Sequence, residues 1–146
     1  MRLFLAMAAG IVALLCLGGV GVFVSLYDDA TKIKRTEPDA VVDSYLRAYL
    51  VNRDPGETSL FTCSSGGDFT QIEAFRGQIE STEKQYTVGV RVSWTSLEVT
   101  AVNGQTTVST DVIRTLTDNS ERDTQRWSFT MVDQDGWRVC KASQLA

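Results

Sequence analysis

Residues 97–112, with the sequence LEVTAVNGQTTVSTDV, decide the fold class because two alternating apolar patterns meet at Asn103-Gly104. Asn-Gly between such patterns is the strongest short-range signal for a tight β-hairpin. The side chains of one parity are Leu97, Val99 and Ala101 before the turn, and Val108, Thr110, Val112 and Leu116 after it. This stretch therefore predicts two antiparallel strands, each with one face on a core.

Upstream of this hairpin, the alternation continues on the opposite parity, through Val88, Val90, Val92 and Trp94. A change of parity within one strand requires an extra residue or a bend, because successive side chains point to opposite faces. We therefore expect one long strand with a bulge or bend near Thr95-Ser96.

Downstream, two further strands are predicted. Residues 118–123 form a polar turn, and Asp135-Gly136 marks a second turn. Trp127, Phe129 and Met131 alternate in the first strand, and the second contains Trp137, Val139 and Cys140. The second half of the chain is thus predicted to be a four-stranded antiparallel meander.

Residues 36–84 carry helical periodicity and predict three helices. The first has Thr36 as an expected cap, Asp39 in capping-box spacing and Pro38 in its first turn. Asp54-Pro55-Gly56 ends this helix and starts a short second one that reaches Cys63. A cap signal at Asp68 begins the third helix, which extends to about residue 84. Helices followed by antiparallel strands predict an α+β fold, with the helices on one side of a curved sheet.

The N-terminal segment has a different character. Leu3 to Leu26 contains no ionisable side chain except the thiol of Cys16, and its 24 residues exceed the roughly 20 that span a bilayer as a helix. We predict a retained transmembrane anchor over residues 1–26, a linker over 27–35 and a folded domain over 36–146. A cleaved signal peptide and a lipoprotein signal ending at Cys16 are the alternatives. The flanking charges do not decide the orientation.

Charge and cysteine content narrow the function classes. Beyond the apolar segment the chain has 13 basic and 18 acidic residues, a net charge of −5 (13 minus 18), which argues against nucleic-acid binding. Histidine is absent, so a His-Cys zinc site is excluded. Cys63 and Cys140 form either one disulfide or two separate thiols, and we favour the disulfide. Such a bond implies an oxidising compartment, with the N-terminus cytoplasmic and the domain extracytoplasmic.

Several short motifs carry a family resemblance. They are NRDPGE at 52–57, LFTC at 60–63, VNG at 102–104 and DGWRVC at 135–140. With the order of elements over residues 36–140, they resemble the nuclear transport factor two-like (SnoaL-like) cone fold, and more narrowly the membrane-anchored actinobacterial Mce-associated proteins. The resemblance implies that the sheet wraps round the first helix and that Cys63 and Cys140 form a bridge. It also implies an accessory role in envelope transport or secretion.

The sequence contains little that indicates catalysis. Relatives in this fold that act as isomerases use acid/base residues in a cavity, but Asp111 lies on the parity expected to face solvent. Arg114 lies either at a pocket mouth or at the sheet end. The residues predicted as candidate cavity lining are Tyr45, Tyr49, Trp94 and Arg114. No metal or cofactor site is predicted.

The leading prediction is a non-catalytic interaction module at the membrane, which binds another envelope protein or a second copy of itself. Binding of a small molecule or lipid inside the cone is the alternative, and an isomerase-like enzyme comes third.

Overall fold

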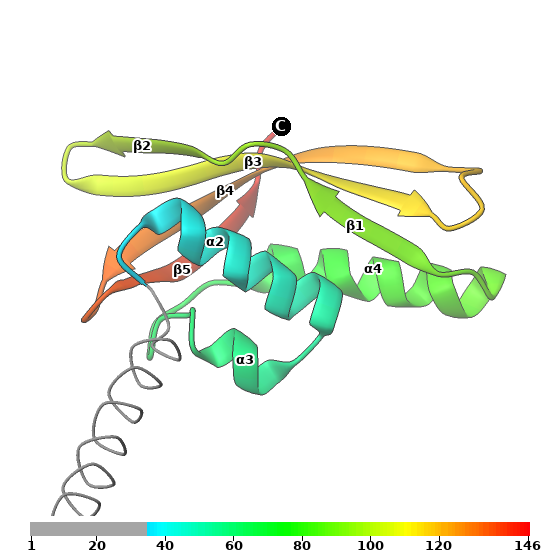
Figure 1. Ribbon diagram of the computed structural model, residues 1–146, viewed down its shortest axis with the longest axis horizontal. Helices are drawn as coiled ribbons and strands as arrows, with labels where there is room; N and C mark the ends of the chain where they lie inside the picture. The colour runs from blue at the N-terminus through cyan, green and yellow to red at the C-terminus, as the bar shows by residue number, and fades with distance from the viewer. Residues whose placement is uncertain (1–34) are drawn as a thin grey trace, which may run out of the picture. The chain divides into compact units, whose positions relative to one another are not determined.

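In the computed structural model, residues 35–146 are described, and they form an α+β domain of three helices packed on a five-stranded antiparallel sheet (Figure 1). The predicted transmembrane segment and its linker, except Arg35, lie outside these residues. Within the described part of the chain, no helix is long and apolar enough to cross a membrane.

The helical layer begins with α2 (Pro38–Leu46), which runs directly into a π-helix, η1 (Arg47–Asn52). The predicted cap at Thr36 is wrong: the residue at the N-cap is Glu37, and its side chain makes no capping hydrogen bond. Pro38 starts the helix instead, since its fixed φ suits the first turn and its missing N–H has no intrahelical partner there. The chain leaves η1 through Arg53, which adopts the left-handed conformation with φ of 56°.

An aspartate lies close before the first residue of each of the other two helices, α3 and α4. Asp54 caps α3 (Pro55–Ser59) by accepting a hydrogen bond from the Glu57 N–H at 3.0 Å. The long helix α4 (Thr70–Tyr86) starts after Phe69. Asp68, predicted as its cap, accepts from the Thr70 N–H at 3.3 Å and so lies one residue before the N-cap.

The sheet contains five strands, which are β1 (Val90–Trp94), β2 (Glu98–Val102), β3 (Gln105–Leu116), β4 (Arg122–Asp133) and β5 (Trp137–Gln144). They are ordered β1-β3-β4-β5, and β2 pairs with the other half of β3. The predicted long first strand is therefore two strands, with Trp94 opposite Val112 and Glu98 opposite Ser109. The prediction of four strands is corrected to five.

Thr95 explains why the strand is interrupted. Its N–H donates to the Asp111 carbonyl at 3.0 Å, while its own carbonyl accepts from the Thr110 hydroxyl at 3.1 Å. The Thr95 hydroxyl in turn accepts from the Asp111 N–H at 3.1 Å. Side-chain oxygens thus replace part of the backbone ladder here. Because Val92 and Val99 both lie opposite helix-facing residues of β3, the predicted change of parity is confirmed.

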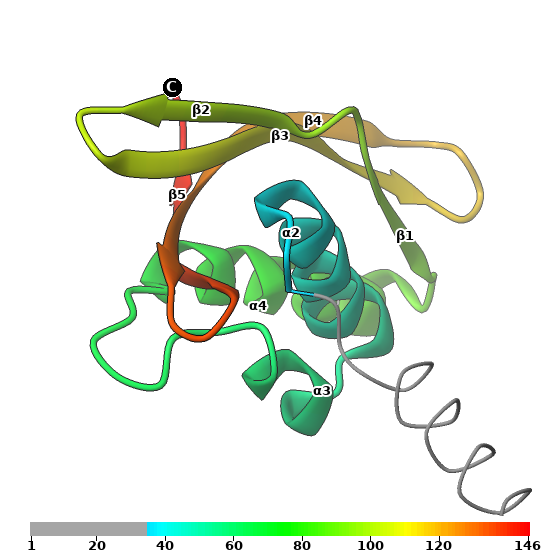
Figure 2. The same cartoon turned by 60° about the vertical axis from the view of Figure 1, so that its left-hand side comes forward.

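The sheet curves round α2, with β1 and β5 descending on either side of it (Figure 2). Burial of apolar side chains between the two layers is the main force that holds them together. The largest fully buried side chains in this layer boundary are Trp127, Tyr45, Phe129, Leu46, Ile72 and Ile79. The fold therefore places β5 at one edge of the sheet, and β1 and β2 at the other, around a filled interior.

Candidate functional site

The edge of the sheet at β5 is covered by the chain that connects α3 to α4. This segment, residues 61–68, runs along β5 and forms isolated parallel bridges with it. Four backbone hydrogen bonds join them: Val139 N–H to Phe61 O (2.8 Å), Cys63 N–H to Val139 O (2.9 Å), Asp68 N–H to Cys140 O (2.9 Å) and Ala142 N–H to Asp68 O (3.1 Å). The edge groups of β5 are thus paired within the domain.

A disulfide fixes this cover in place. Cys63 and Cys140 are bonded, with Cα atoms 5.0 Å apart and a separation of 77 positions in sequence, which confirms the predicted pairing. Arg138 adds a second attachment, because its guanidinium donates to the carbonyls of Leu60 at 3.3 Å and Thr62 at 3.1 Å. The β5 edge is therefore held by covalent, backbone and charged contacts.

The opposite edge is open along β2. All five residues of this strand are exposed, including Val99 (47%) and Val102 (58%). Within residues 35–146, β3 is the sole strand that pairs with β2. A strand edge of this kind presents unpaired N–H and C=O groups to another chain.

The turn after β2 indicates which backbone groups face outward. Asn103 and Gly104 have φ of 52° and 79° and form a two-residue hairpin turn of the primed type. The residues that flank such a turn, Val102 and Gln105, are a hydrogen-bonded pair, and hydrogen-bonded and non-bonded pairs then alternate along the ladder. The N–H and C=O groups of Val99 and Ala101 consequently point to the open edge.

This edge lacks the devices that usually protect a strand. Lysine, proline and bulges deter pairing with other chains, and β2 has none of them. Its one charged side chain, Glu98, accepts a hydrogen bond at 2.8 Å from Arg126 of β4. Sequence reasoning missed this surface. The available signal was the uncharged run Val99-Thr100-Ala101-Val102 beside the hairpin turn.

The interior between helices and sheet is packed with large side chains. Tyr45, Trp127 and Phe129 are each at most 1% exposed, and the Tyr45 ring packs edge-on against Phe129 with centroids 6.0 Å apart. The indole N–H of Trp127 is buried without a hydrogen-bond partner among the described residues. These side chains fill the central space of the domain.

Tyr45 and Tyr49, two of the predicted cavity residues, line a cavity of about 240 Å³ among the helices. Their rings stack with centroids 5.6 Å apart, and the Arg76 guanidinium lies 5.0 Å from the Tyr49 ring centre. Burial raises the pKa of both phenols, so both stay neutral at physiological pH. Phe69 and Glu73 also line this cavity.

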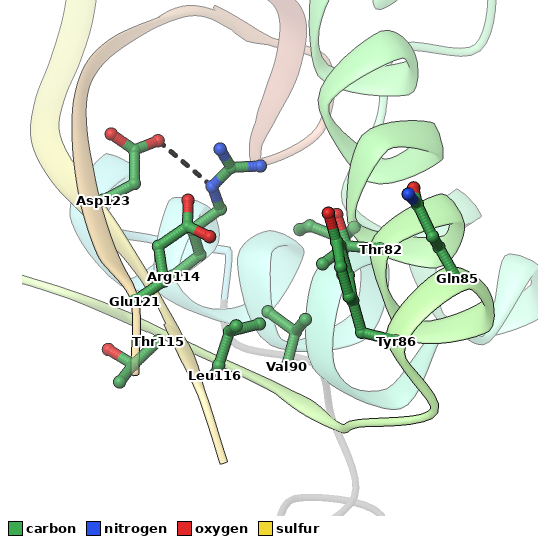
Figure 3. Close-up of a pocket in the computed structure, with 10 residues that line it drawn as sticks. Thr82, Gln85, Tyr86, Val90, Arg114, Thr115, Leu116, Glu121 and Asp123 are labelled. Atoms are coloured by element: carbon green, nitrogen blue, oxygen red, sulfur yellow. Dashed lines mark ion pairs between the residues drawn. The ribbon is translucent and has the colours of Figure 1, made fainter. Parts of the chain in front are cut away.

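Arg114, another predicted residue, lines a different cavity of about 250 Å³ between the C-terminal part of α4 and the sheet. Its Nε donates to Asp123 Oδ2 at 3.1 Å, and Figure 3 shows this pair beside Glu121, facing Thr82 and Tyr86 of α4 across the cavity. This end of the domain is mostly polar, so it suits a small hydrophilic molecule better than an acyl chain.

Trp94, the fourth predicted residue, uses its indole N–H to donate to Asp43 Oδ1 of α2 at 2.8 Å. The Arg47 guanidinium lies 5.8 Å from its ring centre. The four residues predicted as cavity lining thus lie at three places in the domain, with Tyr45 and Tyr49 together and Trp94 and Arg114 each elsewhere.

Two further groups bear on chemistry. Asp111 is 35% exposed at its side chain and lies 3.7 Å from Arg126, on the face of β3 turned away from the helices. Glu83 receives two hydrogen bonds from Arg53, at 2.7 and 2.8 Å, which lower the pKa of its carboxyl together with the Val90 N–H. Among residues 35–146 no group of three or more metal-binding side chains is gathered in one place.

Comparison with known proteins gives a likeness of fold. No protein-family model matches the chain, and no curated protein matches it. Among solved structures, it is similar to Bdellovibrio bacteriovorus Bd1075, with 14% sequence identity and a TM-score of 0.50 over 71% of this chain. The match spans 38% of the length of Bd1075. This similarity supports the fold of the domain and carries no residue's role.

Proposed function

We propose that this chain is a non-catalytic interaction module, a cone-shaped domain on a single-pass membrane anchor. It faces away from the cytosol and docks against another cell-envelope protein or a second copy of itself. The observation that carries this proposal is the open edge of β2, whose residues Val99 to Val102 carry no charge. An exposed strand edge supplies main-chain hydrogen bonds for affinity, and its alternate side chains supply specificity.

The filled interior supports docking over chemistry inside the domain. Binding of a lipid inside the cone needs a central cavity, whereas Tyr45, Trp127 and Phe129 occupy the centre of the domain. Apolar surface is instead exposed at the edge strand, where Val99 and Val102 lie outside the core. Exposed apolar side chains beside unpaired backbone groups are typical of protein-binding surfaces.

Two features support the extracytoplasmic compartment in this proposal. The Cys63–Cys140 disulfide is of a kind that persists in oxidising, extracytoplasmic surroundings. The apolar sequence from Leu3 to Leu26 is long enough to serve as the anchor. Anchoring in the membrane lowers the entropic cost of association with a partner in the same membrane, because both molecules are already confined to two dimensions.

A site-specific photo-crosslinker in the full-length chain, in its native membrane, tests this function. We expect the photoreactive residue at Val102 to give one discrete protein adduct, identified by mass spectrometry. The matched control is Val51 on η1, which is a valine of similar exposure at 49%. Adducts in equal yield at both positions, or at neither, would contradict a docking role for β2.

A second candidate function is binding of a small polar molecule at Arg114. The half-buried Arg114–Asp123 pair at the mouth of the 250 Å³ cavity favours it, because a guanidinium there can bind a carboxylate or phosphate. Titration of the full-length protein with acetate, succinate and inorganic phosphate, followed by thermal unfolding, tests this candidate. A raised melting temperature that disappears in Arg114→Gln would support it, and no shift with any of the three would argue against it.

A further inference from the structure

We infer that β2 pairs with β2 of a second copy of this chain, antiparallel and centred on Thr100, so that the two sheets join into one. This inference rests on the proposed function, which requires only that some chain occupies the open edge. The inference adds the identity of that chain and the register of the pairing, so it can be wrong while the proposed function is right.

The side chains of β2 are complementary to themselves in this register. Antiparallel pairing about Thr100 places Val99 opposite Ala101 of the second copy, and Ala101 opposite its Val99. Because Val99 lies opposite Val108 and Ala101 opposite Thr106, all four side chains fall on the helix-facing side of the joined sheet. They form one apolar row across the two-fold axis, as an isologous interface requires.

The charges also permit this pairing. Glu98 would face Val102 of the second copy, so no like charges lie opposite each other. The two Glu98 residues would be four positions apart along the strands, about 13 Å at the rise of an extended chain, which is more than one Debye length of about 8 Å at physiological salt. Each is already engaged by its own Arg126 at 2.8 Å.

The backbone geometry of the same register is favourable. Val99 and Ala101 direct their N–H and C=O groups outward, so each Val99–Ala101 pair across the axis is a hydrogen-bonded pair. Two such pairs give four inter-chain hydrogen bonds. Shifting the register by one residue would place outward groups opposite inward ones and lose these bonds.

A cysteine cross-link tests the register directly in the full-length protein reconstituted in lipid nanodiscs. In the proposed pairing, the two Thr100 residues form a non-hydrogen-bonded pair with Cα atoms about 4.5 Å apart, within the range that a disulfide bridges. We expect Thr100→Cys, in a Cys16→Ser background, to give a disulfide-linked dimer at several times the yield of Val51→Cys. Peptide mapping should find the 100–100 linkage, with Cys63–Cys140 intact.

Ala101→Pro tests whether the outward backbone groups make the pairing, because it removes an outward N–H without removing a hydrogen bond to β3. In the Thr100→Cys background it should abolish the cross-link while the native disulfide still forms. A Thr100→Cys dimer no more abundant than the Val51→Cys dimer would overturn the second-copy inference. If the Val102 photo-adduct then proves to be another protein, docking at β2 stands with a different occupant; if it is also missing, both proposals fail.

Discussion

The two edges of this sheet are treated in opposite ways. At β5, residues 61–68 supply four backbone hydrogen bonds, a disulfide and the Arg138 contacts. At β2, nothing within residues 35–146 pairs with the outer side of the strand, and its valines are half exposed. One fold therefore contains both a protected edge and an unprotected one. The difference teaches that this chain can cover a strand edge with an irregular segment, and that no described segment does so at β2.

The largest expected loss of stability comes from removing the Cys63–Cys140 disulfide, which holds residues 61–68 against β5. The double variant Cys63→Ser/Cys140→Ser should lose about 2 to 4 kcal/mol of unfolding free energy, because the unfolded chain regains the entropy of a long loop. Chemical denaturation followed by Trp fluorescence measures it. Hydrogen exchange should also accelerate at residues 61–68 more than at β2. A change below measurement error would mean that the cover is held without its covalent link.

A matched pair of proline substitutions compares the edges directly. Ala142→Pro removes the N–H that donates to the Asp68 carbonyl, at a residue that is 2% exposed, and should cost about 2 to 3 kcal/mol. Ala101→Pro removes an N–H that faces outward, so the domain should lose less than about 1 kcal/mol. Denaturation of the two variants at low protein concentration gives the contrast. Equal losses would show that the Ala101 N–H is paired within the domain.

Substitution of one arginine at each edge should give a smaller difference in unfolding free energy. Arg138→Ala removes charged hydrogen bonds to the Leu60 and Thr62 carbonyls and should cost about 1 to 2 kcal/mol. Arg126→Ala removes exposed ion pairs with Glu98 and Asp111, and should cost at most about 0.5 kcal/mol. Thermal unfolding at two salt concentrations separates them, because the exposed pairs are screened by salt. A salt-sensitive loss in Arg138→Ala would contradict its role in holding the cover.

An effect smaller than that of Arg138→Ala is a dependence of stability on pH at β1, the other strand on the side of the sheet opposite β5. Arg53 and the Val90 N–H lower the pKa of the Glu83 carboxyl below its usual 4.5, so its stabilising contribution is complete above that pH and is lost as the pH falls through the lowered value. Glu83→Gln should reduce stability at pH 7 by about 0.5 to 1 kcal/mol. The two proteins should then converge as the pH falls through the lowered pKa of Glu83. Parallel stability curves from pH 7 to pH 3 would rule out this contribution.

Much of the fold was predictable because it depends on local pattern. The hairpin at Asn103-Gly104, the change of parity near Thr95 and the order of helices before strands all follow from alternation and turn residues. The pairing of Cys63 with Cys140 was implied by family resemblance and favoured by their number. The number of strands was not predictable, because the Thr95 hydroxyl competes with backbone groups for hydrogen bonds, and such a contact forms between residues 16 positions apart.

The candidate site could not be predicted from the sequence. Tyr45, Tyr49, Trp94 and Arg114 were grouped because each has a side chain suited to a cavity, but the structure brings together only the two tyrosines. Residues 61–68 pair with β5 through main-chain atoms, which leave no mark on residue type. Whether an edge strand is covered depends on such contacts, so the open edge of β2 could be identified only after the cover of β5 was seen.

The disulfide has one more consequence, for the fate of a damaged molecule. The segment between Cys63 and Cys140 contains α4 and β1 to β4, so most of the sheet lies inside a covalently closed ring. A protease that cuts once within this ring, for example at the Asn103-Gly104 turn, leaves both fragments joined. A nicked protein would therefore migrate as one chain until it is reduced, and a partner could still be held by a molecule whose backbone is broken.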